Sequence, residues 1–326
     1  MSVYIAGTGS YLPEKILTNA DLEKRVETSD EWIRVRTGIE ERHIAAAGEA
    51  TSDMAKIAAE RALKAAGITG ADLSAIVVAT STPDHTFPNT ACLLQHALGC
   101  GPILCYDLCA ACSGLIYALE TASALIRSNT NYRYVRVCGA EKLSGIVDWD
   151  DRNTCVLFGD GAGAFVLENR DGDDKFPVSC LGADGTYSGT LILPAGGSRN
   201  PTSHETVDRR MHYIHMLGKE TFKLAIKAMV ESSNNVLSAA GVAPEEVALV
   251  IPHQANRRII QAVAQRLAVP PDRVFDNVNR YGNTSASSIG IAFDDAVSSG
   301  RLKRGDLVLL TAFGSGLTWG AMLIRY

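Results

Sequence analysis

Two stretches of the sequence repeat each other and decide the fold: ALKAAGITGADLSAIVVAT at residues 62–80 and VLSAAGVAPEEVALVIPHQ at residues 236–254. Aligning Gly67 with Gly241 gives an offset of 241 − 67 = 174 residues. Each copy has an amphipathic segment that ends in glycine, which caps helices because it adopts the left-handed conformation at little cost. Each copy then passes through a short acidic turn into an unbroken apolar run, which is typical of a strand covered on both faces. The sequence therefore predicts a duplicated helix–strand unit.

The same register extends beyond the two copies. YVRVCG at 134–139 falls near DLVLLTA at 306–312, and a helix expected from about residue 112 falls near one expected from about 286–288. Apolar strands between helices predict an α/β protein of layered sheets and helices, made of βαβ-type units, and not a barrel. A charged string within residues 168–177 predicts the division into an N-terminal half, 1–170, and a C-terminal half, 171–326. Sites tend to lie where such halves meet.

The composition places the chain among ordinary globular proteins. It has 326 residues, of which 46% are hydrophobic and 21% charged. The net charge of −5 argues against a nucleic-acid partner. No segment resembles a signal peptide or a transmembrane helix, so we expect no membrane association. Eight cysteines, all within the first 60% of a chain too long for a small disulfide scaffold, indicate a reducing compartment, and we expect a cytoplasmic protein.

Cys112 is the first candidate for chemistry. It follows the apolar run 103–108 and precedes a helical pattern whose apolar face includes Leu115 and Leu119. The free N–H groups at a helix start favour a thiolate, which is the nucleophilic form of cysteine. Two alternatives stay open: Cys112 is a small buried hydrophobic residue, or it forms a C-x-x-C thiol redox site with Cys109.

Two further polar residues are expected near Cys112. His253 ends the second apolar strand, and Asn283 lies in the loop that leads into the repeat of the Cys112 helix. The duplication predicts that all three converge, although a core histidine and a turn asparagine have ordinary structural explanations. The motif GDGAGA at 159–164 resembles a dinucleotide-binding loop, but the strand-like AFVLE that follows excludes that function. FGSG at 313–316 predicts a tight turn whose N–H groups could hold an oxyanion.

Several motifs in a fixed order now identify a resemblance that covers essentially the whole chain. The chain resembles the β-ketoacyl-acyl-carrier-protein synthase III family, the initiating condensing enzymes of bacterial fatty-acid synthesis. The resemblance implies the thiolase fold, a five-layer αβαβα sandwich. The motifs are GTGSYLP (7–13), TSDEWI and RTGI (28–39), AACSG (110–114), DRNTCVLFGDGAGA (151–164), PHQAN (252–256), YGNTSASS (281–288) and FGSGLTWG (313–320).

The resemblance also implies roles at the candidate site. Cys112 is implied to accept the acyl group, and His253 with Asn283 completes a Cys–His–Asn triad. The backbone N–H groups of Cys112 and Ser315 are implied to hold the oxyanion, although many relatives have glycine or alanine in place of Ser315. The implied reaction condenses acetyl-CoA with malonyl-ACP to acetoacetyl-ACP, CoA and CO₂, without a metal or redox cofactor.

Binding residues and partners are implied in the same way. The implied coenzyme A contacts are Thr28, Trp32, Arg36, Arg152 and Asn256. The implied carrier-protein contacts are Gln254, Ala255, Asn256, Arg257, Arg258, Lys223 and Arg266. In the implied homodimer, Phe87 reaches into the partner's acyl pocket and favours a short acetyl starter. Relatives that make quinolone or polyketide products share the triad, so a condensing enzyme of secondary metabolism is the alternative.

Overall fold

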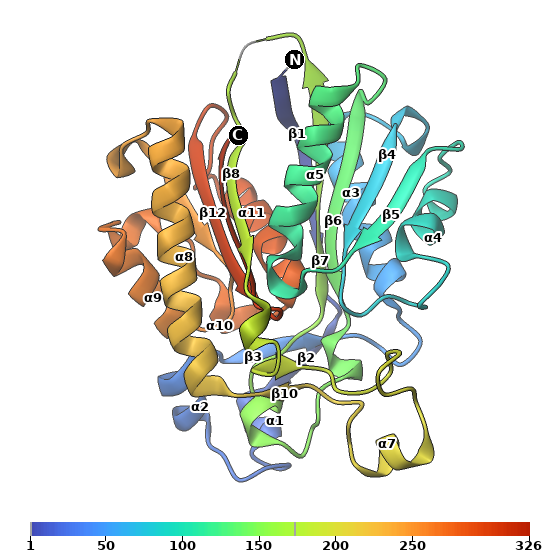
Figure 1. Cartoon of the computed structure of the whole chain (residues 1–326), viewed down its shortest axis with the longest axis vertical. Helices are drawn as coiled ribbons and strands as arrows, with labels where there is room; N and C mark the ends of the chain where they lie inside the picture. The colour runs from blue at the N-terminus through green and yellow to red at the C-terminus, as the bar shows by residue number, and fades with distance from the viewer. Residues whose placement is uncertain (1, 173) are drawn as a thin grey trace.

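The computed structural model describes residues 2–172 and 174–326 and contains two large β-sheets (Figure 1). The five-stranded sheet has the order β1 (Ser2–Tyr11), β7 (Gly161–Arg170), β6 (Tyr134–Glu141), β4 (Ala75–Ala79) and β5 (Leu104–Leu108). The four-stranded sheet has the order β11 (Leu249–Pro252), β12 (Leu307–Gly314), β13 (Thr318–Arg325) and β8 (Val178–Ala183). The apolar strands of the two sequence repeats are β4 and β11. Each pairs in parallel with a neighbouring strand of its sheet, β4 with β6 and β11 with β12.

Helices form three layers around these sheets. The central helices α5 (Gly114–Ser128) and α11 (Ser288–Ser298) contact both sheets, and their apolar side chains belong to one core cluster with strands of both halves. The helices α3 (Thr51–Ala66) and α4 (Thr90–Ala97) cover the outer face of the five-stranded sheet. The helices α8 (Gly218–Ala240) and α9 (Arg257–Arg266) cover the outer side of the other sheet (Figure 1). The predicted five-layer αβαβα sandwich is confirmed.

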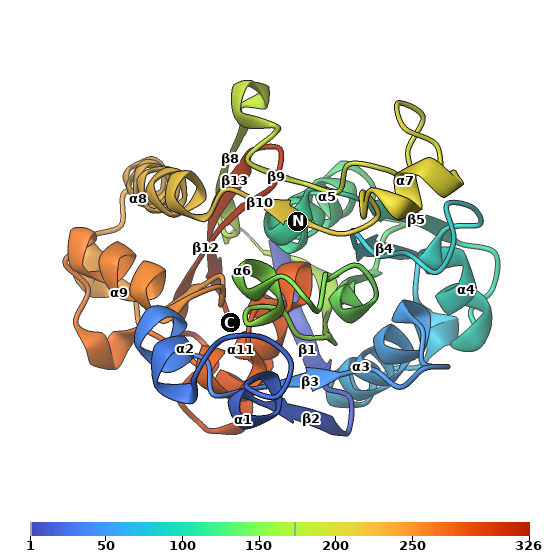
Figure 2. The ribbon, with the colours of Figure 1, turned by 90° about the horizontal axis from the view of Figure 1, so that it is seen from below.

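The remaining strands and α-helices gather at one end of the sandwich, seen from below in Figure 2. Their apolar side chains, including Leu22 and Ile33, form a separate core cluster at that end. The strands are β2 (Lys15–Thr18), β3 (Glu41–Ile44), β9 (Leu191–Ile192) and β10 (His215–Met216), and the helices are α1 (Asn19–Leu22), α2 (Asp30–Thr37), α6 (Arg152–Cys155), α7 (His204–Asp208) and α10 (Val278–Tyr281). Short 3₁₀ turns are η1 (Gly70–Asp72), η2 (Ala111–Ser113), η3 (Leu143–Gly145), η4 (Gly185–Tyr187), η5 (Pro244–Glu246), η6 (Pro271–Arg273) and η7 (Ser285–Ser287).

The repeat seen in the sequence is present in the backbone. Gly67 ends α3 with φ +70° and Gly241 ends α8 with φ +61°, so both glycines occupy the left-handed conformation that the pattern predicts. GDGAGA runs directly into β7, which confirms a strand after the motif where a dinucleotide site needs a helix. In FGSG, Phe313 and Gly314 end β12, and Ser315 and Gly316 lie in the tight turn to β13, as predicted.

Every strand of the five-stranded sheet precedes residue 171, and every strand of the four-stranded sheet follows residue 177. The exact boundary at 170/171 stays a prediction, and the charged string that suggested it includes Asp173, which lies outside the described residues. Among the described residues, we find no helix with the length and apolar character that a membrane span requires.

Candidate active site

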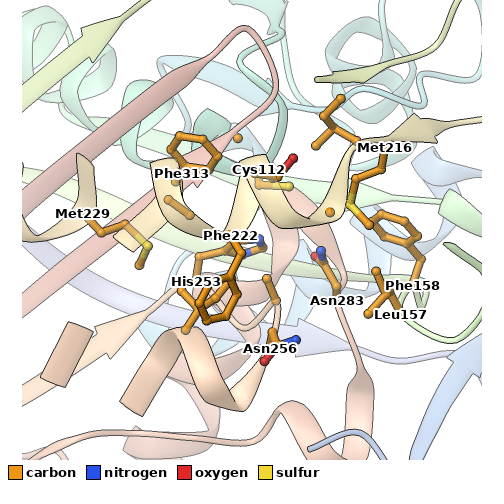
Figure 3. A pocket seen from close by; sticks show the side chains of 17 residues that line it. Cys112, Leu157, Phe158, Met216, Phe222, Met229, His253, Asn256, Asn283 and Phe313 are labelled. Atoms are coloured by element: carbon orange, nitrogen blue, oxygen red, sulfur yellow. The ribbon is translucent and has the colours of Figure 1, made fainter. Parts of the chain in front are cut away.

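Cys112, His253 and Asn283 line one pocket of about 160 Å³ (Figure 3). Cys112 comes from η2 at the start of α5, His253 follows β11, and Asn283 precedes η7. All three are buried. The structure therefore brings together, from the two halves of the chain, the three residues that the sequence predicts to converge.

Close approach of β12 fixes the backbone of Cys112. A Cβ atom on Gly314 would lie 2.7 Å from the backbone nitrogen of Cys112, so a side chain at position 314 would push the strand away. The hairpin that follows is tied to the same turn, because the Thr318 hydroxyl lies 2.9 Å from the carbonyl oxygens of both Ala110 and Ser315. The backbone of Ser315 is thus held beside that of Cys112.

Ser315 fits its turn without backbone strain. It is absent from the non-glycine residues that have a positive φ, so a Cβ atom is accommodated there. Its hydroxyl donates to the carbonyl of Leu191, 2.5 Å away, and both Ser315 and Cys112 line a second cavity. The serine side chain is therefore compatible with the role implied for its backbone N–H group.

Burial controls the electrostatics of Cys112 and His253. Removal from solvent raises the pKa of the Cys112 thiol to about 12, against which a hydrogen bond from Ser285 acts. Desolvation therefore opposes the thiolate that the helix start favours. Burial also lowers the pKa of His253 to about 4, so its imidazole is neutral near pH 7. Its Nδ1 atom lies 2.6 Å from the Ser288 hydroxyl, which leaves Nε2 for the pocket.

Asn283 is held in one orientation by its neighbours. Its Oδ1 atom accepts a 2.8 Å hydrogen bond from the N–H group of Ser285. Its own backbone donates to the Leu157 carbonyl and accepts from the Gly159 N–H group. With Oδ1 occupied, the amide NH₂ group is the part of the side chain that remains for donation in the pocket.

A third pocket, of about 560 Å³, adjoins the first one, and we call it the channel. It is lined by Trp32 and Arg36, and it shares with the first pocket the residues Leu157, Met216, Gly218 and Asn256. Two guanidinium groups lie close to the Trp32 ring, with that of Arg152 5.0 Å and that of Arg36 5.5 Å from its centre. An aromatic ring close to cations at the mouth of a channel is suited to a flat ring carrying phosphates.

The other residues implied in coenzyme A binding lie near Trp32 and Arg36, and Arg152 and Asn256 form hydrogen bonds with neighbouring residues. Arg152 also donates to the Glu27 carbonyl, next to Thr28 in the chain. The Thr28 hydroxyl is buried and has no hydrogen-bond partner within the described residues. Asn256 donates to the Arg36 carbonyl and caps α9 by accepting from the Arg258 N–H group. The structure thus gathers this predicted set around the channel mouth.

Gln254 is not on the surface, contrary to its predicted contact with a carrier protein. It is 1% exposed, because its amide bonds the carbonyls of Pro252 and Phe275 and the N–H group of Asn277. A carrier cannot touch it without unfolding this segment. Its neighbour Ala255 is partly buried and lines the first pocket.

The basic residues of the predicted carrier surface are mostly accessible. Arg257 is tied to Asp276 by a 2.7 Å ion pair, whereas Arg258, Lys223 and Arg266 are exposed. Two further exposed lysines of α8, Lys219 and Lys227, were not predicted from the sequence to belong to this surface. Their spacing of four residues on either side of Lys223 was the available signal, because such residues share one helix face.

Phe87 projects away from this site. Its side chain is 84% exposed and lines none of the pockets described above. The second cavity that contacts Cys112 has a volume of about 420 Å³ and is lined by Cys109, Ser285 and Ser315 among others. Among residues 2–172 and 174–326, no three His, Cys, Asp or Glu side chains are placed to hold a metal ion.

Duplicated halves in five layers, with a buried cysteine at the start of a central helix, define a thiolase-fold protein. Family models described as 3-oxoacyl-[acyl-carrier-protein (ACP)] synthase III and its C-terminal part match residues 106–185 and 237–326. The beta-ketoacyl-[acyl-carrier-protein] synthase III of Caldanaerobacter subterraneus is 52% identical over 99% of this chain and 97% of its own. The chain belongs to the β-ketoacyl-[acyl-carrier-protein] synthase III family.

Solved structures agree with this assignment. The crystal structure of 3-oxoacyl-[acyl-carrier-protein] synthase III from Aquifex aeolicus matches with a TM-score of 0.91 and 49% identity, covering 100% of both chains. The priming β-ketosynthase of the R1128 polyketide biosynthetic pathway matches with a TM-score of 0.90 and 32% identity, over 99% of this chain and 96% of that one.

Proposed function

We propose that this protein catalyses the first decarboxylative condensation of fatty-acid synthesis. Acetyl-CoA transfers its acetyl group to the Cys112 sulfur, and CoA leaves. Malonyl-ACP then loses CO₂, and its carbanion attacks the acetyl thioester to give acetoacetyl-ACP. The observation that carries the proposal is the convergence of Cys112, His253 and Asn283 in one buried pocket at the end of a channel.

The channel supports the use of a CoA thioester in the first half-reaction. Trp32 and the two guanidinium groups at its mouth suit an adenine ring and phosphates, and the shared residues leave a path for the thioester arm. At the buried end, the backbone N–H groups of Cys112 and Ser315 hold the oxyanion, a role that the close approach of Gly314 to the Cys112 nitrogen supports. In other acyl-transfer enzymes, the loss of one such donor costs about 3 kcal/mol of transition-state stabilisation.

The second half-reaction uses the pair from the C-terminal half. A neutral His253 and the NH₂ group of Asn283 donate to the thioester carbonyl of malonyl-ACP and stabilise the enolate that forms as CO₂ departs. A neutral imidazole suits this role because it donates one hydrogen bond without needing to take up a proton. The chemistry requires no metal or redox cofactor.

The partners follow from the surface. We propose that an acidic carrier protein docks on the basic residues of α8 and α9, with Asn256 at the mouth of the channel. We also propose a homodimer, because β5 is an edge strand of its sheet and the neighbouring Phe87 and Leu104 expose apolar surface. In that dimer Phe87 narrows the partner's acyl cavity and favours acetyl. The eight free cysteines agree with a cytoplasmic location.

Intact-protein mass spectrometry tests the reaction directly. Incubation with acetyl-CoA is expected to add one acetyl group to Cys112, and malonyl-ACP is expected to remove it as acetoacetyl-ACP forms. Cys112→Ala is the matched control and takes up no acetyl group. A protein that remains unlabelled with acetyl-CoA and forms a Cys109–Cys112 disulfide would instead support the redox alternative.

The similarity to a polyketide priming synthase favours one second candidate, a condensing enzyme of secondary metabolism. The same experiment separates the two functions when acetyl-CoA competes with longer and aromatic acyl-CoA thioesters. Preferential acetyl labelling supports fatty-acid initiation. Preferential labelling by a longer or aromatic group keeps the nucleophile and moves the enzyme to a specialised pathway.

A further inference from the structure

Glu141 is a buried carboxyl group for which the proposed reaction has no use. It is the last residue of β6 and is 0% exposed. No ion pair to it occurs within the described part of the chain. A buried carboxylate without a cation is costly unless hydrogen bonds replace its hydration. Here the bonds come from the Ser81 N–H group at 3.1 Å and the Thr82 hydroxyl at 2.7 Å.

Two hydrogen bonds connect Glu141 with the opposite half of the molecule, one from the Ser285 hydroxyl and one from the Ala286 backbone. The Ser285 hydroxyl of η7 lies 3.1 Å from Oε1 of Glu141. The Ser285 side chain also acts on Cys112, since it lowers the pKa of the thiol, and Ser285 and Cys112 line the same cavity of about 420 Å³. Ser285 is held at this junction by an unusual backbone, with φ +49°, and by the bond from its N–H group to Asn283. The side chains therefore form a continuous path from Cys112 through Ser285 to Glu141.

We propose that Glu141, acting through the Ser285 hydroxyl, takes the proton of the Cys112 thiol when this cysteine becomes the nucleophile. The S–H bond breaks and its proton moves to the Ser285 oxygen, while the Ser285 hydroxyl proton moves to Oε1 of Glu141. The electron pair stays on the sulfur, so one negative charge passes from the carboxylate to the thiolate. The buried site carries the same total charge before and after the transfer, which avoids creating a second buried charge. The inference rests on the nucleophilic role proposed for Cys112.

The single hydroxyl proton of Ser285 explains how the protonation of Cys112 is coupled to that of Glu141. A hydroxyl has a single proton to donate. When Glu141 is a carboxylate, that proton is directed to Oε1, and the thiol can donate to the Ser285 oxygen. When Glu141 is protonated, it donates to the same oxygen and frees the Ser285 proton for the thiolate. The Ser285 hydroxyl therefore donates a hydrogen bond to the Cys112 thiolate only after Glu141 has taken up the proton.

The surroundings of Glu141 agree with proton acceptance. Burial raises the pKa of Glu141 to about 7, so the carboxyl is poised to gain a proton near neutral pH. His253, the other basic group of the pocket, is a poor acceptor because burial lowers its pKa to about 4. Of the titratable groups on the packed elements, Cys112 faces Glu141 from η2, and Cys109 lies beyond Ser81, with its sulfur 3.7 Å from that hydroxyl.

The charged neighbour in the chain does not neutralise the carboxylate. Lys142 follows Glu141 directly, but its ammonium group bonds the carbonyls of Ala46 and Glu49 on the other side. The turn η7 contributes serine and alanine to this site and no charged group. Glu141 and Cys112 are therefore a coupled pair, whose titration belongs to both groups together.

The pH dependence of Cys112 alkylation tests the relay without using the acyl-transfer reaction. The rate with iodoacetamide, located at Cys112 by peptide mass spectrometry, is expected to rise to a plateau with a midpoint near the pKa of Glu141, about 7. Glu141→Gln keeps the size and most hydrogen bonds, and is expected to lose this midpoint, so that the rate keeps rising about tenfold per pH unit. Glu141→Asp retains a carboxyl and is expected to restore a plateau.

A second variant and a matched control complete the test. Ser285→Ala is expected to lower the plateau about tenfold through loss of the donor to the thiolate; Ala111 has φ +46° at the equivalent position, which shows that alanine fits this backbone. Asp160→Asn alters another buried carboxyl, bonded to Ser144 and Ala45, and is expected to keep the wild-type midpoint.

An unchanged midpoint in Glu141→Gln, or no midpoint near pH 7 in the wild type, would overturn the relay. If Glu141→Gln does not fold, an unchanged plateau in Ser285→Ala overturns it equally. Acetylation of the wild type by acetyl-CoA is measured in parallel. Normal acetylation with a failed relay test removes this inference alone, whereas absence of acyl transfer removes the proposed function.

Discussion

The 3₁₀ turn before α5 and the one before α11 can be compared residue by residue, because the offset of 174 residues relates them. Ala111 and Ser285 begin the two turns with nearly the same backbone, φ +46° and φ +49°. Each turn contains the same local hydrogen bond of 2.8 Å, from Ser113 to the Ala110 carbonyl and from Ser287 to the Thr284 carbonyl. The duplication has therefore preserved the backbone of both turns.

The side chains on these matching backbones differ, and the difference assigns the chemistry. The first turn carries Cys112 where the second carries Ala286. At three other positions of the site the second half carries a histidine, a serine or an asparagine that the first half lacks. The same offset pairs His253 with Ala79, Ser288 with Gly114 and Asn283 with Cys109. In the proposed mechanism, one copy supplies the nucleophile and the other supplies the hydrogen-bond donors. Neither half contains the complete site, and the pocket forms only where the two copies meet.

The largest loss of activity is expected when Cys112 is replaced by alanine, the residue that the second turn carries at the equivalent position 286. Cys112→Ala removes the nucleophile, so we expect acetylation to disappear and condensation to fall at least about 10³-fold. Ala286 shows that alanine fits this turn, so the thermal unfolding midpoint should stay close to that of the wild type. Labelling by acetyl-CoA and a melting curve measure both outcomes. Wild-type condensation by this variant would contradict the role of Cys112.

Replacing a polar residue of the second half is expected to slow the half-reaction in which malonyl-ACP is decarboxylated. His253→Ala, which copies Ala79, or Asn283→Ala removes a donor to the enolate, so malonyl-ACP decarboxylation should fall about 10²–10³-fold. Acetylation of Cys112 should change much less, because that step uses the backbone N–H groups. Rapid-quench measurements of the two steps distinguish them. Equal losses in both steps would break the proposed division of labour.

A smaller effect is expected from the residue behind His253. Ser288→Ala removes the hydroxyl that lies 2.6 Å from Nδ1 and fixes the imidazole orientation. Loss of such a bond costs roughly 1–1.5 kcal/mol, so decarboxylation should fall about tenfold. Ser233→Ala is the matched control, because it deletes a buried hydroxyl that has no hydrogen-bond partner among the described residues. An equal loss of activity in the control would show that Ser288 acts only through stability.

The outer helices extend the comparison to the surface and give the smallest expected effect. Lys223→Glu reverses an exposed charge on α8, and we expect it to raise the KM for malonyl-ACP about threefold to tenfold while leaving Cys112 acetylation unchanged. Lys64→Glu makes the same change on α3, the repeat of α8, far from the channel. The effect of Lys223→Glu should shrink with added salt. The same KM change in both variants would indicate a general charge effect and not a docking surface.

Local patterns in the sequence predicted most of the fold. The glycine caps at Gly67 and Gly241 and the apolar strands after them specify the two repeats, because backbone conformation and burial pattern are encoded locally. The duplication then predicted that Cys112, His253 and Asn283 meet, and they do. Gln254 could not be placed in this way. Its motif suggests a surface contact, whereas the packing against Phe275 and Asn277 buries it.

The sequence by itself determined the duplication, the layered α/β fold and the three residues of the pocket, since each depends on short-range periodicity and on one fixed offset. Only the tertiary structure decided the protonation of that pocket. The helix start at Cys112 predicted a thiolate, but burial raises the pKa of the thiol. The hydrogen bond between Glu141 at the end of β6 and Ser285 in η7 joins two residues that are 144 positions apart in the chain. Desolvation and contacts between distant segments depend on the packed molecule, so no local pattern could reveal them.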